Sequence, residues 1–117
     1  MLDVDARHQI ISWMTILLTL RTILQFREFD ALGTLYWEEA LEGLDGLLQD
    51  PYSAIGYVLH DNHEANLVAD IGKAVNRIGN DVGQVVSYHP WVTNSGWRCV
   101  EQCVGEFLTQ VQRMPPK

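Results

Sequence analysis

The sequence lacks basic residues over its middle third. The chain has 117 residues, and none of its eight Lys and Arg residues lies between Glu28 and Asp70, where ten of the fifteen Asp and Glu residues occur. The net charge is −7. This balance argues against binding to nucleic acid or to anionic membranes, because both rely on Lys and Arg to neutralise phosphate. It favours a basic protein as the partner.

Long apolar runs are also missing. The longest, residues 10–20, contains three hydroxyl side chains and is followed by Arg21, so it falls short of the roughly 20 apolar residues that span a bilayer. The first five residues include two Asp and no Lys or Arg, whereas a secretory signal begins with a positively charged region. The sequence therefore predicts a cytoplasmic protein.

Cysteine is scarce. The chain has two, Cys99 and Cys103, and they lie four positions apart. At helical spacing both side chains point along one face, where a disulfide would need distorted geometry. A catalytic thiol needs a nearby cation or a helix N-terminus and access to substrate. Both cysteines instead fall in an apolar stripe typical of core positions, so no catalytic pair with His89 is expected.

Apolar residues at helical spacing account for most of the chain. Hydrophobic residues make up 47% and charged residues 20%, an ordinary globular composition. We expect one domain over residues 1–117, an all-α bundle of about five helices without strands. The predicted helices cover residues 5–26, 34–48 with Thr34 as cap, 51–59 with Asp50 as cap, 62–82 with Asp61 as cap and Gly83 as stop, and 90–111 with Pro115 and Pro116 as stop.

The first predicted helix has two apolar stripes. The second stripe consists of Ile11, Met14 and Leu18, which alternate with small hydroxyl residues. Two stripes indicate two neighbours. Either this is a central helix packed on both sides, or the second stripe is the seam of a homodimer.

Some of the acidic residues have a structural explanation. Asp50, Asp61 and Glu64 lie where helix caps are expected, and Asp70 is offset by Lys73 three positions later. The six other acids between Glu28 and Asp70 lie on the second predicted helix and in the loop before it. The predicted partner-binding residues are Glu28, Asp30, Glu38, Glu39, Glu42 and Asp45.

A cluster of His and acidic residues offers a metal site as an alternative. His60, His63 and Glu64 are ligand types for zinc and other transition metals. Their spacing does not match the H-E-x-x-H motif or its inverted relative. A capped helix start explains the same residues, so no metal or cofactor is expected.

Four tryptophans are many for this length. Trp13 and Trp37 fall on predicted core stripes. Trp91 and Trp97 lie near a helix start with polar residues between them, so they are either core residues or half-exposed interface anchors.

A pattern of separate residues and pairs runs from residue 50 to residue 91: Asp50-Pro51, Ile55-Gly56, Val58-Leu59, Asp61, Glu64, Gly83, Tyr88, His89-Pro90 and Trp91. In this pattern the stretch from Asp50 to Pro90 resembles a family of short, acidic, uncharacterised bacterial proteins similar to immunity proteins. The resemblance implies a small protein whose acidic face covers a basic toxin or enzyme, and it implies no catalytic activity.

These observations favour a non-enzymatic, cytoplasmic binding protein, immunity- or inhibitor-like, that uses an acidic helical face against a basic protein. One alternative is an inhibitor that mimics nucleic-acid charge and occupies the phosphate-binding cleft of a nuclease or defence protein. A small metal-dependent enzyme built on the histidine cluster is the other.

Overall fold

The computed structural model describes residues 2–113, with the side chain of residue 113 excepted. Five α-helices and two short 3-10 helices make up most of the chain, and no strand forms among the described residues, so the predicted all-α class is confirmed. The helices are α1 (Val4–Leu24), η1 (Arg27–Phe29), α2 (Asp30–Gln49), η2 (Pro51–Ala54), α3 (Asn62–Val82), α4 (His89–Val92) and α5 (Trp97–Arg113). The predicted stop at Pro115 and Pro116 lies outside the described residues.

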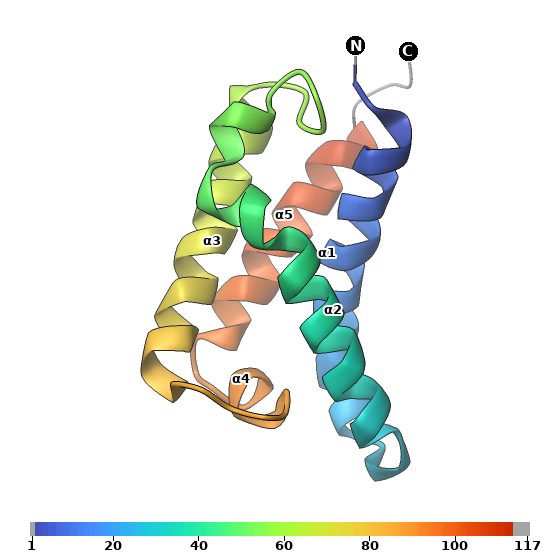
Figure 1. Cartoon of the computed structure of the whole chain (residues 1–117), viewed down its shortest axis with the longest axis vertical. Helices are drawn as coiled ribbons and strands as arrows, with labels where there is room; N and C mark the ends of the chain where they lie inside the picture. The colour runs from blue at the N-terminus through green and yellow to red at the C-terminus, as the bar shows by residue number, and fades with distance from the viewer. Residues whose placement is uncertain (1, 114–117) are drawn as a thin grey trace.

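The helices pack around one core. In Figure 1, α5 lies between α1 and α3, and α2 crosses the front of the molecule from the α3 side toward the lower end of α1. Each long helix contributes fully buried apolar side chains, such as Leu17, Leu44, Ile71, Ile78 and Val104. Within residues 2–113 no helix is both long enough and apolar enough to cross a membrane.

Local capping explains where α3 begins and ends. Asp61 Oδ1 accepts a hydrogen bond from the Glu64 backbone N–H at 3.0 Å, as expected for an N-cap. Gly83 ends the helix with a φ of 68°, a conformation that favours glycine. The predicted start and stop of this helix are confirmed.

Three other predicted boundaries are wrong. The second helix begins at Asp30 rather than after Thr34, which lies inside α2. The helix predicted for residues 51–59 is only the 3-10 turn η2, because Gly56 has a φ of 89° and turns the chain. The last predicted helix is two helices, α4 and α5. Between them Asn94 Oδ1 accepts a hydrogen bond from the Gly96 N–H at 2.8 Å, a contact that competes with helical hydrogen bonding.

Two glycines let α2 approach its neighbours closely. A Cβ on Gly43 would stand 2.5 Å from the ring of Trp13 in α1, and a Cβ on Gly72 in α3 would stand 2.7 Å from the carbonyl oxygen of Leu48. A third glycine, Gly46, has open space around it. The close approaches fix α2 against α1 and α3, and this placement determines what the outer face of α2 presents.

Candidate functional site

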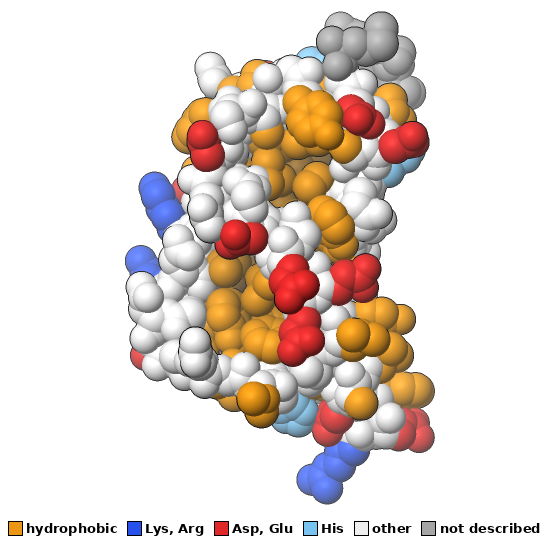
Figure 2. All heavy atoms as spheres, viewed as in Figure 1, with side chains coloured by type: hydrophobic (Ala, Val, Ile, Leu, Met, Phe, Trp, Pro, Cys, Tyr) orange, Lys and Arg blue, Asp and Glu red, His pale blue; other side chains and the backbone are white. Residues whose placement is uncertain are grey.

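The outer face of α2 carries four exposed carboxylates, which we call the acidic ridge: Glu38, Glu39, Glu42 and Asp45. Figure 2 shows acidic side chains gathered over α2 on one face of the molecule. No Lys or Arg side chain of the described residues forms an ion pair with the ridge. Asp45 accepts hydrogen bonds from Gln49 Nε2 at 3.0 Å on both oxygens. The ridge is therefore a surface of uncompensated negative charge.

The two other predicted partner-binding acids lie apart from the ridge. Glu28 is exposed in η1. Asp30 is used within the molecule: its Oδ1 accepts a hydrogen bond from the Tyr88 hydroxyl at 3.1 Å and lies 3.2 Å from His89 Nε2. Burial raises the pKa of Tyr88 to about 12, and the hydrogen bond to Asp30 and the charge of Asp30 add to this effect. Asp30 thus ties α2 to α4 rather than contributing to the ridge.

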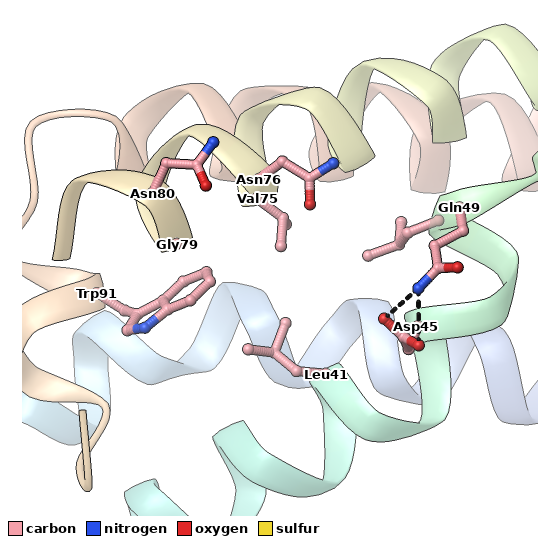
Figure 3. A pocket seen from close by; sticks show the side chains of 9 residues that line it. Leu41, Asp45, Gln49, Val75, Asn76, Gly79, Asn80 and Trp91 are labelled. Carbon is pink, nitrogen blue, oxygen red and sulfur yellow. Dashed lines mark hydrogen bonds between the residues drawn. The ribbon is translucent and has the colours of Figure 1, made fainter. Parts of the chain in front are cut away.

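A pocket of about 270 Å³, which we call the α2–α3 pocket, lies on one side of the ridge. Figure 3 shows Leu41 and Asp45 of α2 facing Val75 and Asn76 of α3, with Trp91 of α4 at one end. Its lining residues are Leu41, Asp45, Leu48, Gln49, Val75, Asn76, Gly79, Asn80 and Trp91. One ridge carboxylate therefore opens into a partly enclosed space.

A second hollow, of about 420 Å³, lies between α1, α2 and η2, and we call it the α1–α2 groove. Ile10, Trp13, Leu47 and Val58 give it an apolar lining. Trp13 and Gly43 also line a further hollow, together with Glu38, Glu39 and Glu42 of the ridge. In Figure 2 hydrophobic side chains are visible in hollows on both sides of the acidic side chains. The ridge is thus flanked by accessible apolar surface.

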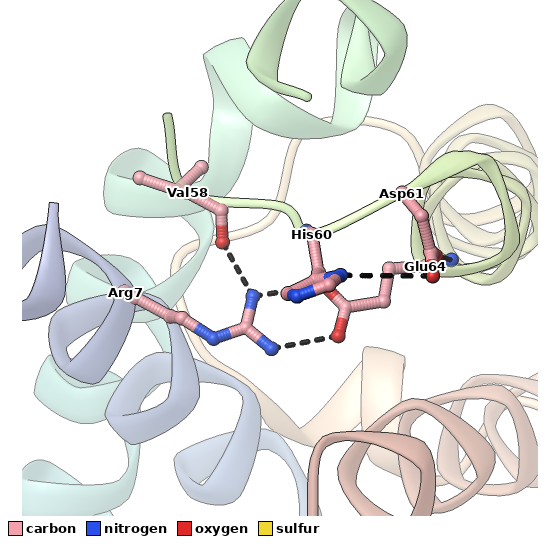
Figure 4. A network of polar contacts seen from close by, with 5 residues as sticks. All are labelled: Arg7, Val58, His60, Asp61 and Glu64. Carbon is pink, nitrogen blue, oxygen red and sulfur yellow. Dashed lines mark hydrogen bonds and ion pairs between the residues drawn. The ribbon is translucent and has the colours of Figure 1, made fainter. Parts of the chain in front are cut away.

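The predicted metal candidates do not come together. Glu64 is fully buried, and it accepts hydrogen bonds from Arg7 Nη1 at 2.8 Å and Arg7 Nη2 at 2.6 Å (Figure 4). It also accepts one from the backbone N–H of His60 at 2.7 Å. The His63 side chain is exposed on α3, beside a separate hollow. Among residues 2–113 no group of three or more His, Cys, Asp or Glu side chains could hold a metal ion.

Arg7 is a partner of Glu64 that the sequence patterns did not reveal. It lies 57 positions earlier in the chain, and it also donates to the carbonyl oxygen of Val58 at 2.7 Å. The Asp3 backbone N–H donates to the Tyr57 carbonyl oxygen nearby, at 2.8 Å. No local spacing signals such a contact, so only the folded structure identifies it.

The two cysteines are less buried than the predicted core positions. Cys99 is exposed rather than in the core, whereas Cys103 is half-buried, and neither is in a disulfide. Burial raises the pKa of the Cys103 thiol to about 11, and Cys99, Asp70 and Glu106 add smaller contributions. A thiol with such a raised pKa stays protonated near neutral pH and is a poor nucleophile.

The predicted dimer seam is only partly accessible. Met14 is fully buried in the core of a single chain, as expected for a central helix packed on both sides, and leaves no side-chain surface for a homodimer contact. Ile11 and Leu18 are half-buried, and Leu18 packs against the core. A homodimer remains a prediction, which sedimentation of the purified chain would test.

The two tryptophans near α4 and α5 are core residues. Trp97 is fully buried, and Trp91 is 8% exposed. The ring centroids of Trp91 and Trp37 lie 5.8 Å apart. Trp91 also lines the α2–α3 pocket.

No family model, curated protein or solved structure matches the chain. The resemblance to short acidic bacterial proteins therefore stays a prediction.

Proposed function

We propose that the chain is a non-enzymatic, cytoplasmic binding protein of the immunity or inhibitor type, and that its acidic ridge binds a basic protein. The observation that carries the proposal is the set of four exposed carboxylates on one helix, which form no ion pair with a Lys or Arg side chain of the part of the chain that the structure describes. Oppositely charged surfaces raise the rate of association, and salt lowers that rate.

The flanking hollows support a protein partner. Specific protein interfaces combine charged or polar contacts with apolar contacts that exclude water. The ridge supplies the charge, while Leu35 at its edge is 57% exposed and the α1–α2 groove supplies further apolar area. The ridge would thus steer the encounter, and the apolar surface would stabilise the complex.

The lining of the hollows favours a protein partner over mimicry of nucleic acid. Mimicry needs a second row of carboxylates beside the first, as on the two strands of a duplex. Across the α2–α3 pocket, α3 contributes the amides Asn76 and Asn80, and α1 contributes Ala6 and Gln9 to the α1–α2 groove. None of these four residues is acidic, and Asp50, which also lines the groove, follows the end of α2 and is a single carboxylate rather than a second row.

Charge reversal tests the proposal. The variant Glu38→Lys, Glu39→Lys, Glu42→Lys should fail to retain a basic protein that the wild-type chain captures from cells of its source organism. With that protein purified, the association rate should fall at least about tenfold at low salt, within the 10–10³-fold range of electrostatic steering. Surface interferometry over a salt series measures this rate.

The matched control carries Asp5→Lys, Glu106→Lys and Asp70→Lys, three exposed acids outside the ridge. It has the same net charge as the ridge variant, so it should keep most of the association rate. Equal rates for wild type and ridge variant, or equal losses in both variants, would rule out the ridge as the binding surface.

A further inference from the structure

The α2–α3 pocket combines hydrogen-bond acceptors with an aromatic ring. Asp45 brings a carboxylate, and Gln49, Asn76 and Asn80 bring carboxamide oxygens, whereas no Lys, Arg or His lines the pocket. A carboxylate has about four acceptor positions, and Gln49 Nε2 is the one donor bound to Asp45. No side-chain hydrogen bond joins Asn76 or Asn80 to another described residue. The pocket therefore has several acceptors available to a cationic donor.

An apolar section separates the carboxylate from the indole. In Figure 3, Leu41 and Val75 face each other between Asp45 at one end and Trp91 at the other. A Cβ on Gly79 would lie 3.6 Å from Trp91 Cη2. Because residue 79 is glycine, no side chain from this position fills the space beside the ring.

We propose that this pocket receives an arginine side chain of the basic partner, an inference that rests on the proposed function and names the group recognised. A guanidinium has five N–H donors in one plane, which suits Asp45 and the carboxamide oxygen of Gln49 at one end of the pocket. The methylene stem of arginine suits the apolar section formed by Leu41 and Val75, which leads toward Trp91. The volume of about 270 Å³ lies just below the usual range of about 300–1,000 Å³ for small-molecule sites, which suits a single side chain.

Arginine suits the site better than lysine for two reasons. The lysine ammonium has three donors rather than five, so it uses fewer of the acceptors, and it is more strongly hydrated, so it loses more when it enters the pocket. Citrulline has nearly the same shape as arginine but no charge, so it should lose the attraction to Asp45.

The probe is the blocked peptide acetyl-Gly-Arg-Gly-amide, titrated into the ¹⁵N-labelled chain and followed by NMR. We expect saturable shifts at the backbone amides of Gly79 and Asn80 and at the indole N–H of Trp91. The lysine peptide should bind more weakly, and the citrulline peptide should give no saturable shift at these positions. Absence of saturable shifts with the arginine peptide, or equal binding of the citrulline peptide, would overturn the proposal.

Two variants with the same change in charge localise the site. Asp45→Asn should weaken arginine-peptide binding about tenfold, equivalent to about 1.4 kcal/mol. Glu42→Gln removes a ridge carboxylate that does not line the pocket, so it should change binding less than about twofold, which is about 0.4 kcal/mol. Both side chains are exposed, so neither variant is expected to unfold. Equal weakening in the two variants would show that the peptide is attracted to the ridge in general, and it would overturn the proposal that the pocket binds arginine.

The two proposals can fail separately. If the arginine peptide does not bind but ridge reversal still slows association with the partner, the pocket proposal is wrong and the proposed function stands. If the peptide binds through Asp45 while ridge reversal has no effect on the partner, the pocket is supported and the role of the ridge is wrong.

Discussion

Glu64 combines two structural roles in one side chain. Among residues 2–113 it is the only charged side chain in the fully buried core, with no exposed surface. Its carboxylate accepts the two hydrogen bonds from Arg7 and one from the His60 N–H, while its own backbone N–H is held by Asp61. A buried carboxylate depends on such partners, because it has lost its hydration.

Removing Arg7 should therefore be costly. We expect Arg7→Met, which keeps the side-chain stem, to lower the free energy of unfolding by about 3–5 kcal/mol, the range for breaking a buried ion pair. Adding Glu64→Met should recover much of that loss, because no unpaired charge remains. Urea denaturation of the two single variants and the double variant measures both effects.

The surface ion pair between Arg21 and Glu101 is the control. Its N–O distance is 2.7 Å, close to that of the buried pair, but the Arg21 side chain is 42% exposed. Exposed pairs contribute about 0–1 kcal/mol, so Arg21→Met should have a small effect. A comparable loss in Arg7→Met and Arg21→Met would show that burial does not set the energy of the first pair.

Stability should fall at alkaline pH through two residues. The pKa of Cys103 is raised from 9.0 to about 11 and that of Tyr88 from 10.0 to about 12. The unfolded chain loses these protons at lower pH than the folded chain. The contribution of the two groups to the free energy of unfolding is therefore complete below pH 9 and declines between pH 9 and pH 12. Urea denaturation on both sides of this window measures the decline.

Tyr88→Phe identifies the tyrosine part of this dependence. The variant should lose about 1 kcal/mol near neutral pH, since the hydrogen bond to Asp30 is gone. Its stability should decline less steeply between pH 10 and 12 than that of the wild type. An unchanged slope would mean that Tyr88 does not titrate differently on folding.

At the scale of single elements, the sequence predicts what depends on neighbours in the chain. The cap of α3 at Asp61, the glycine at its end and its apolar stripe are all set within a few residues, and the structure confirms them. The four acids of the ridge lie on an exposed face of α2, as predicted, for the same reason. The homodimer and the partner depend on a second molecule, so they stay predictions.

The errors concern features that tertiary contacts or backbone conformation decide. Asp30 at the start of α2 accepts a hydrogen bond from Tyr88, 58 positions away. No local sequence pattern predicts that hydrogen bond. Gly56 has a positive φ and ends what looked like a helix. The α2–α3 pocket joins three helices, so its composition could not be read from any one segment.

The contact between α2 and α3 gives a prediction for two glycines that look alike in sequence. Gly72→Ala should destabilise the protein by about 1–3 kcal/mol, as for overpacking, because its Cβ would meet the Leu48 carbonyl oxygen at 2.7 Å. Gly46→Ala has open space and should stabilise α2 by up to about 1 kcal/mol. Thermal or urea unfolding of the two variants measures the difference. Similar changes in both would show that the helices are not in close contact at Gly72.

For the molecule as a whole, the charge is unevenly distributed. The acids of α2 occupy one face, and the Lys and Arg side chains visible in that view lie at the edges of the molecule (Figure 2). Like charges one turn apart, such as Glu38 and Glu42, destabilise a helix by about 0.2–0.5 kcal/mol per pair. The ridge thus gains its capacity to attract a partner at some cost to the stability of the free chain.

Salt should therefore stabilise the isolated protein. Because screening shortens the range of repulsion from about 10 Å at 0.1 M to about 3 Å at 1 M, the free energy of unfolding should rise with NaCl. The variant Glu38→Gln, Glu42→Gln, Asp45→Asn should be more stable at low salt and depend less on NaCl. A stability that falls with NaCl, or the same dependence in both proteins, would contradict this account.

The pairing of Arg7 with Glu64 also bears on the order of events in folding. The cap between Asp61 and Glu64 spans three positions and forms within one turn, whereas the ion pair closes a loop across 57 positions, a step with a larger entropic cost. A contact that forms only after the main folding barrier changes the unfolding rate and leaves the folding rate nearly unchanged. We expect the ion pair to form after the helices have assembled. It would then slow unfolding and lengthen the lifetime of the folded molecule without changing how fast that molecule forms.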